Sequence, residues 1–176
     1  MSIEKLLDSK TVYEGRMINL RVDSIELPSG RQTTREIVEH RDSVVIVPVD
    51  NDNILLVRQY RSALGKVLIE LPAGKTESNE HHLQTAHREL REETGYNARD
   101  MEYLGGFYAG PGYSTEYLHL YLATDIVALD EHPDDDEIMD VFSVPISEIP
   151  GMIGKGEICD SKSVAGLLRI INNMQK

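Results

Sequence analysis

Three glutamates, Glu89, Glu92 and Glu93, lie close enough in the sequence to share one side of a helix. Residues 79–94 contain no proline or glycine, and Gly95 stands where a left-handed helix C-cap belongs, so we expect a helix here. At about 100° per residue, the glutamates share one arc, with Glu89 and Glu93 stacked one turn apart. The neighbouring arc is apolar and is expected to be buried: Leu83, Ala86 and Leu90.

This arc of carboxylates is locally unfavourable. Like charges one turn apart repel each other, and carboxylates in the last turns face the negative end of the helix dipole. Arg88 and Arg91 offset part of this repulsion, which leaves open an ordinary solvated helix face with salt bridges. The alternative is a hard divalent cation, Mg²⁺ foremost, because it prefers carboxylate oxygens and keeps waters that a phosphate can replace. The residues favour this metal site.

The sequence around these glutamates resembles the Nudix box. Its fixed positions are present in order: Gly74, five residues, Glu80, seven residues, then Arg88-Glu89-Leu90-x-Glu92-Glu93-x-Gly95-Tyr96. Tyr96 stands where the box usually has an aliphatic residue. In the Nudix family, the loop and helix of this box bind metal ions, and water cleaves a nucleoside diphosphate linked to another group.

Particular roles follow from this resemblance. It implies that Glu89 and Glu93, together with the carbonyl of Ala73, are metal ligands. It also implies catalytic roles for Glu92 and Arg88. The ion is expected to be Mg²⁺, with Mn²⁺ as a substitute.

The length and the composition limit the class of protein. With 176 residues, the chain is long enough for one principal domain with a small appendage. A net charge of −12 argues against a nucleic-acid-binding surface, so an anionic substrate must be met by a metal or a few arginines. The single cysteine, Cys159, excludes an internal disulfide and indicates a reducing compartment. Since no signal peptide or membrane-spanning run of about 20 apolar residues is present, we expect a cytoplasmic protein.

Residues 1–40 are expected to form a β-strand extension ahead of a Nudix domain at 41–176. An alternating stretch at 18–23 predicts one strand, and 31–40 predicts the returning strand of a hairpin. A hairpin of this size is marginal on its own. It resembles the extension that ADP-ribose pyrophosphatases of the Nudix family exchange between subunits, which implies a homodimer with Arg35 near the partner's nucleotide. A hairpin packed on its own domain is the alternative.

The remaining elements are read from apolar runs and helical periodicity. Strands are expected at 44–49, 54–61, 68–71, 101–108, 116–126 and 139–144, and helices at 147–153 and 163–174. Together with the resemblance, these elements predict an α+β fold. It is an α/β/α sandwich around a mixed β-sheet, with an N-terminal antiparallel strand extension.

Two segments resemble substrate-binding parts of the ADP-ribose pyrophosphatases. In the segment at 58–61, the second arginine of the family pattern, here Arg61, meets the substrate phosphates, a task that suits its planar fork. A plain ion pair on the strand surface is the alternative, and we prefer it for Arg58. Pro111 lies sixteen residues after the last glycine of the box and resembles the proline that marks the ADP-ribose-hydrolysing branch of the family. A Pro-Gly-x-Ser-x-Glu stretch that ends at Glu116 supports this match.

An acidic run at 130–137 carries six acids in eight positions. Such a run is usually a solvated loop. If metal ions occupy all the box carboxylates, a general base must come from elsewhere in the chain. By resemblance to the pyrophosphatases, we expect Glu137 to be that base or a substrate-dependent metal ligand.

The expected reaction is Mg²⁺-dependent hydrolysis of the pyrophosphate bond of ADP-ribose, which gives AMP and ribose 5-phosphate. GDP-mannose or another sugar nucleotide is the alternative substrate. A non-catalytic, nucleotide-binding regulator with the Nudix fold is the alternative from another class, and the intact Glu89, Glu92 and Glu93 argue against it.

Overall fold

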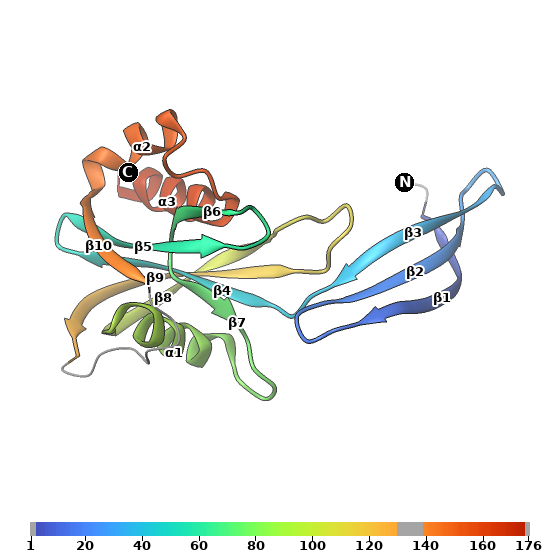
Figure 1. Cartoon of the computed structure of the whole chain (residues 1–176), viewed down its shortest axis with the longest axis horizontal. Coiled ribbons are helices and arrows are strands. Elements are labelled where there is room, and N and C mark those ends of the chain that lie inside the picture. Colours follow the sequence, from blue (N-terminus) through green and yellow to red (C-terminus); the bar gives the residue numbers. More distant parts are fainter. Residues whose placement is uncertain (1–2, 130–138, 175–176) are drawn as a thin grey trace. The chain divides into compact units, whose positions relative to one another are not determined.

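The computed structural model describes residues 3–129 and 139–174, and the chain divides into two compact units (Figure 1). The first unit comprises Met1–Asp42 and Tyr108–Tyr117. The second comprises Ser43–Phe107 and Leu118–Lys176. The glutamates of the box belong to the second unit.

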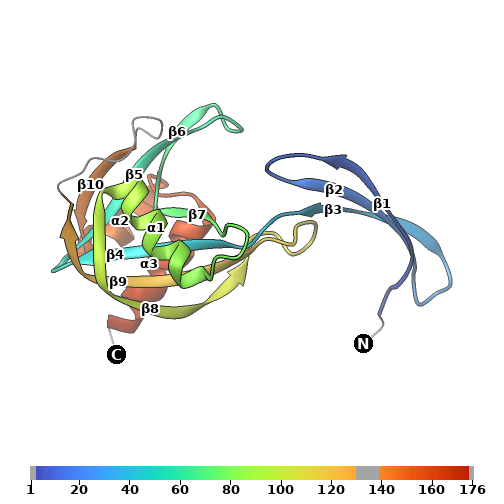
Figure 2. The same ribbon diagram turned by 90° about the horizontal axis from the view of Figure 1, so that it is seen from below.

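The first unit contains a three-stranded antiparallel sheet, with strand order β1-β2-β3 (Figure 2). The strands are β1 (Lys5–Glu14), β2 (Asn19–Glu26) and β3 (Gln32–Glu39). The expected hairpin corresponds to β2 and β3, which pair without a shift from Asn19↔Glu39 to Glu26↔Gln32. The sequence prediction missed β1. Every residue of β1 is exposed, so this strand has no buried face and no alternating pattern to reveal it.

The segment that joins β8 to β9 completes the first unit. The Val38 N–H donates to the Tyr113 carbonyl oxygen over 2.7 Å, and the Thr115 N–H donates to the Val38 carbonyl oxygen over 3.0 Å. The His40 N–H donates to the Thr115 hydroxyl over 3.0 Å. These bonds fix the loop that carries Pro111 against the end of β3.

The second unit is built on a seven-stranded mixed sheet. The strand order is β10-β5-β4-β9-β8, with β6 paired to β5 and β7 paired to β4. The strands are β4 (Ser43–Asp50), β5 (Asn53–Arg61), β6 (Lys66–Glu70), β7 (Ala73–Lys75), β8 (Tyr96–Tyr108), β9 (Tyr117–Ala128) and β10 (Asp140–Pro145). The β4–β9 pair is parallel and the other pairs of β4 are antiparallel. The expected mixed sheet is therefore confirmed.

Helices cover both faces of this sheet (Figure 1). They are α1 (His82–Thr94), a 3₁₀ turn (Ile146–Glu148), α2 (Ile149–Lys155) and α3 (Ser161–Met174). On one face, Ala86 and Leu90 of α1 pack with Val44 and Ile46 of β4. On the other face, α2 and α3 pack against the alternate residues of β4. The α/β/α sandwich is thus confirmed, because one strand supplies both cores.

Helix α1 begins later than expected. His81 is the N-cap, with its side chain accepting from the Leu83 N–H, and Gln84 completes a capping box. Gly95 ends the helix in the left-handed conformation, with φ of 74°, as the sequence predicted. The prediction that Leu83 is buried is wrong, since it lies in the first turn and is 38% exposed. No helix within residues 3–129 and 139–174 is long and apolar enough to cross a membrane.

Candidate active site

Gly74 has no room for a side chain on the side that faces Glu89. A Cβ on Gly74 would lie only 1.9 Å from the carboxyl carbon of Glu89 and 2.0 and 2.1 Å from its two oxygens. Gly74 does not have a positive φ, so glycine is required here for space and not for backbone freedom. The carboxylate of Glu89 therefore lies directly on the backbone of β7.

Glu93 contacts the same strand, β7, one helical turn later. Its Oε2 accepts a hydrogen bond from the Ala73 N–H over 2.9 Å. Glu89 and Glu93 are only 8% and 6% exposed. Glu92, by contrast, keeps 49% of its side chain exposed. The solvated helix face that the sequence left open therefore applies to Glu92 and not to the other two glutamates.

Arg88 holds the acidic side chains of the box in place. Its guanidinium donates to both oxygens of Glu80 over 3.0 Å, and to Glu89 and Glu92 over 2.8 Å each. A further bond of 3.1 Å runs to the carbonyl oxygen of Lys75. This makes Arg88 a residue that positions the carboxylates, and the catalytic role expected from the sequence stays a prediction.

Arg88 stabilises the ionised form of Glu80. The hydrogen bond from that guanidinium lowers the pKa of Glu80 to about 2, against the opposing effect of burial. The Glu77 N–H and the Thr85 hydroxyl also donate to Glu80, over 3.2 and 2.9 Å. Glu80 therefore fixes Arg88 and, through it, the glutamates of α1.

The two arginines of β5 have different surroundings. Arg61 donates from Nε and Nη2 to the two oxygens of Glu70, over 2.8 and 2.6 Å, in a bidentate pair. Arg58 pairs with Asp140 over 2.5 Å and lies 3.8 Å above the centre of the Phe142 ring. Arg58 is thus in the surface ion pair that we preferred. The contact between Arg61 and substrate phosphates stays a prediction.

Three of the expected substrate-binding residues belong to the first unit. Arg35 forms an ion pair with Glu4 over 2.5 Å, and Nδ1 of His40 lies 3.5 Å from a carboxylate oxygen of Glu116. Pro111 is exposed in the loop before β9. Their roles at the substrate remain predictions. Glu137, the expected base, lies outside the described residues.

The donors gathered in the last two turns of α1 and on β7 suit a hard divalent cation. Glu89 and Glu93 supply buried carboxylate oxygens, and the Ala73–Gly74 backbone lies against them. In residues 3–129 and 139–174, no group of three or more His, Cys, Asp or Glu side chains is placed to hold a metal. Two carboxylates with one carbonyl nevertheless match Mg²⁺, which usually keeps several waters and takes its remaining ligands from the phosphates of a substrate.

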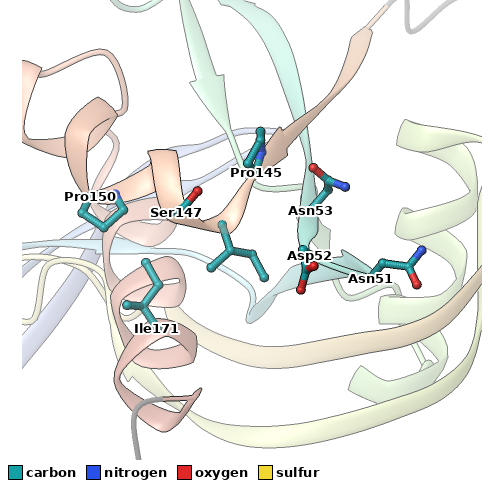
Figure 3. Close-up of a pocket in the computed structure, with 8 residues that line it drawn as sticks. Asn51, Asp52, Asn53, Pro145, Ser147, Pro150 and Ile171 are labelled. Carbon is teal, nitrogen blue, oxygen red and sulfur yellow. The ribbon is translucent and has the colours of Figure 1, made fainter.

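A pocket of about 830 Å³ lies elsewhere in the second unit (Figure 3). Its lining residues are Asn51, Asp52, Asn53, Pro145, Ile146, Ser147, Pro150 and Ile171. None of these eight residues belongs to the box and none is cationic, so this pocket does not suit a diphosphate. The chemistry of the box, rather than the size of a cavity, locates the candidate active site.

The sequence did not point to a second cluster of charges beside the box. Glu70, at the end of β6, is 1% exposed and pairs with both Arg61 and Lys162. Lys162 lies 92 residues later in the chain, in the first turn of α3. No local spacing connects two residues so far apart, and we found no signal for this cluster in the sequence.

Comparison with known proteins agrees with this fold. Residues 39–166 match the NUDIX domain family, and residues 4–38 match the nucleoside diphosphate sugar hydrolase N-terminal domain. The chain belongs to the Nudix family. The expected enzyme class, a Nudix hydrolase of nucleoside diphosphate sugars, is thereby confirmed, and Nudix hydrolases generally use divalent metal ions.

Several relatives match over nearly the whole chain. A methanol dehydrogenase activator from Bacillus methanolicus is 40% identical, over 92% of this chain and 89% of the relative. ADP-ribose pyrophosphatases from Bacillus subtilis and Mycobacterium tuberculosis are 36% and 39% identical, over 91% and 93% of this chain and 88% and 81% of theirs. A crystal structure of an ADP compounds hydrolase has the same fold, with a TM-score of 0.89 at 21% identity over 98% of this chain and 94% of that one.

Proposed function

We propose that this protein hydrolyses the pyrophosphate bond of ADP-ribose to AMP and ribose 5-phosphate, with Mg²⁺ as its metal ion. The observation that carries the proposal is the pair of buried carboxylates, Glu89 and Glu93, held against the Ala73–Gly74 backbone. The two relatives named ADP-ribose pyrophosphatase, at 36% and 39% identity, support the choice of substrate. We expect the reaction to take place in the cytoplasm.

The residues of the box have distinct tasks in this proposal. Glu89, Glu93 and the Ala73 carbonyl would hold the cation. When bound, the ion supplies positive charge against the phosphate oxygens and makes water a better nucleophile. Arg88 keeps Glu89 in place, and Glu92 has more access to solvent than Glu89 and Glu93.

The remaining tasks fall to residues outside the box. Arg61 would bind the diphosphate with the N–H groups of Nη1, because Glu70 takes up Nε and Nη2. Pro111 and Glu116 would bind substrate from the loop before β9. Glu137 would accept the proton from the attacking water.

A homodimer is part of the proposal. The first unit exposes a set of apolar side chains that a monomer would leave in water: Ile3, Leu6, Leu7, Val12, Tyr13 and Met17. We propose that a second copy of the chain covers this surface, with Arg35 reaching the partner's nucleotide. Sedimentation at micromolar concentration should give a dimer. A fully active monomer under those conditions would refute this assembly.

The test of the proposed substrate is a panel assayed for phosphate-monoester products with Mg²⁺ and with Mn²⁺. The panel contains ADP-ribose, GDP-mannose, NADH, a diadenosine polyphosphate and 8-oxo-dGTP. ADP-ribose should give the highest kcat/KM. Faster turnover of GDP-mannose would transfer the assignment to a GDP-sugar, and no turnover of any member would favour a binding regulator.

A second candidate function is the one in the name of the Bacillus methanolicus relative, activation of a methanol dehydrogenase. The 40% identity over nearly the full chain favours testing it. The assay is methanol oxidation by a methanol dehydrogenase with and without this protein. The box variant Glu93→Gln distinguishes activation that needs hydrolysis from activation by contact alone.

A further inference from the structure

A buried carboxylate connects Arg61, the proposed phosphate contact, to the last helix. Glu70 is 1% exposed and receives Arg61 on one side and Lys162 on the other. Burial alone would raise the pKa of Glu70, but the hydrogen bond from Arg61 and the charge of Lys162 outweigh it and hold that pKa below its ordinary value. Glu70 is therefore a charged link between β5 and α3.

The first turn of α3 is itself fixed by Asp160. The Lys162 ammonium donates to Asp160 over 2.9 Å as well as to Glu70. The Ser163 N–H donates to the same Asp160 oxygen over 3.1 Å, and the Ser163 hydroxyl donates to it too. Lys162 thus bridges two carboxylates, and its side chain is only 13% exposed. Such a bridge fixes the position of Glu70 more firmly than one partner would.

The same turn also holds the loop that leads into the box. The Leu71 N–H donates to the Ser163 hydroxyl oxygen over 2.7 Å, and Ser163 is completely buried. Leu71 stands two residues before Ala73, whose N–H is bonded to Glu93. The strand-to-loop segment is therefore held at Leu71 by α3 and at Ala73 by α1.

We propose that the first turn of α3 positions the active site in two ways. Lys162 acts through Glu70 on Arg61, and Ser163 acts through Leu71 on strand β7, which begins at Ala73. This inference rests on the proposed function, since it takes Arg61 as the phosphate contact. Lys162 and Ser163 are positioning residues that do not touch the substrate. The two connections are separate, so each has its own kinetic consequence.

The Lys162 connection is tested by Lys162→Met. The variant keeps much of the side-chain volume but frees one side of Glu70 and removes a positive charge, so KM for ADP-ribose should rise about tenfold while kcat changes less than about threefold. Lys162→Arg should bring KM back to within about threefold of the wild-type value. The matched control is Lys155→Met, because the Lys155 side chain is 74% exposed and its ion pair with Glu157 is long, at 3.8 Å. The control should leave KM unchanged.

Glu70→Gln separates positioning from simple charge attraction. This change makes the neighbourhood of Arg61 more positive, so attraction alone would lower KM for the anionic substrate. Positioning predicts the opposite, a rise of KM of about tenfold, because the bidentate partner of Arg61 is lost. A lower KM in Glu70→Gln would overturn the proposal. If circular dichroism shows that Glu70→Gln does not fold, the KM of Lys162→Met decides whether the proposal stands. If Lys162→Met also fails to fold, Lys162→Gln takes its place.

The Ser163 connection is tested by Ser163→Ala. The variant leaves the Leu71 N–H without its acceptor and loosens the loop, so the Mg²⁺ concentration for half-maximal activity should rise about fivefold. KM for ADP-ribose at saturating Mg²⁺ should stay the same. Titration of Mn²⁺ alone, followed by its electron paramagnetic resonance signal, should show the same weakening without any turnover.

The outcomes distinguish this proposal from the proposed function. A wild-type protein that does not hydrolyse ADP-ribose refutes the proposed function. The KM values of the variants are then compared with the wild type on whichever member of the panel is turned over. If no member of the panel is turned over, weaker Mn²⁺ binding by Ser163→Ala than by the wild type still supports the positioning role of α3, and equal binding refutes it. Lower thermal stability in Lys162→Met and Ser163→Ala, with unchanged KM and unchanged metal binding, would show that the turn of α3 is structural only.

Discussion

Gly74→Ala is the most direct test of the site, because a single methyl group would occupy the place of a carboxylate. The new Cβ would lie 2.0 Å from one oxygen of Glu89 and 2.1 Å from the other. The backbone of Gly74 is in a region that alanine adopts freely. The perturbation therefore acts on the Glu89 side chain and not on the loop conformation.

The size of the effect follows from these distances. Cβ atoms do not approach other heavy atoms closer than about 3.0 Å, so the carboxylate must retreat by about 1 Å. Such a displacement also disturbs its 2.8 Å bond with Arg88. A misplacement of about 1 Å at a catalytic group costs about 10²-fold in rate, so kcat/KM should fall by about two orders of magnitude.

The assay is phosphate-monoester release from ADP-ribose over a range of Mg²⁺ concentrations. In Gly74→Ala the Mg²⁺ dependence should shift to higher concentration, because one carboxylate ligand is displaced. The matched control is Gly154→Ala in α2, where a Cβ would meet nothing within 4 Å. The control should retain wild-type kinetics and gain a little stability, since alanine is the better helix former.

Thermal unfolding of Gly74→Ala should stay close to that of the wild type, because a carboxylate at the end of a flexible side chain can move aside. The reasoning would be refuted by a Gly74→Ala variant with kcat/KM within threefold of the wild type at both low and high Mg²⁺. It would also be refuted if Gly154→Ala lost activity to the same extent.

Three further predictions concern single carboxylates. Glu93→Gln should abolish Mg²⁺-dependent turnover, measured by AMP release, while the unfolding temperature stays the same or rises slightly, because a repelling charge is removed and the amide oxygen can still accept from Ala73. Glu137→Gln should lower kcat by about 10²–10⁴ with little change in KM, as expected for loss of a general base. Glu80→Gln should lower the free energy of unfolding in urea by about 1–3 kcal/mol at pH 6. This loss should shrink as the pH falls from about 4.5 towards 2. Because the folded protein lowers the pKa of Glu80, the ionised side chain stabilises the fold fully above its ordinary pKa, and this stabilisation disappears when Glu80 is protonated.

Each of these predictions has an outcome that contradicts it. Near-normal activity of Glu93→Gln at saturating Mg²⁺ would remove Glu93 from the metal site. A loss below tenfold in Glu137→Gln, with a large loss in Asp135→Asn or Glu116→Gln, would move the base to one of those residues. An equal destabilisation by Glu80→Gln at pH 6 and pH 3 would show that its pairing with Arg88 is not what stabilises the fold.

The sequence was sufficient for the fold class, which followed from the expected elements together with the resemblance to the Nudix family. It was also sufficient for the grouping of the box glutamates, which depends on local periodicity. The helix, its Gly95 cap and the doubly buried strand β4 follow from patterns within about a dozen residues. Periodicity could not show that Glu89 and Glu93 are buried while Leu83 is not. That outcome depends on strand β7 at Ala73 and Gly74, which covers the C-terminal part of the acidic arc.

Features that depend on distant residues were beyond the sequence. Strand β1 has no buried face, so it lacks the alternation by which strands are recognised. The bonds from Lys162 to Glu70 and from Leu71 to Ser163 each join residues 92 positions apart. Neither a charge pattern nor a motif relates such positions, and only the packing of α3 on the sheet brings them together.

The parallel pairing of β4 with β9 has a consequence for how the protein reaches its native state. Both cores of the second unit need β4, and its partner β9 lies about 75 residues later in the chain. At a synthesis rate of about 5–20 residues per second, β4 leaves the ribosome several seconds before β9. During that interval the apolar run at 44–49 has no parallel partner, and the nascent chain is then most open to aggregation and to capture by chaperones.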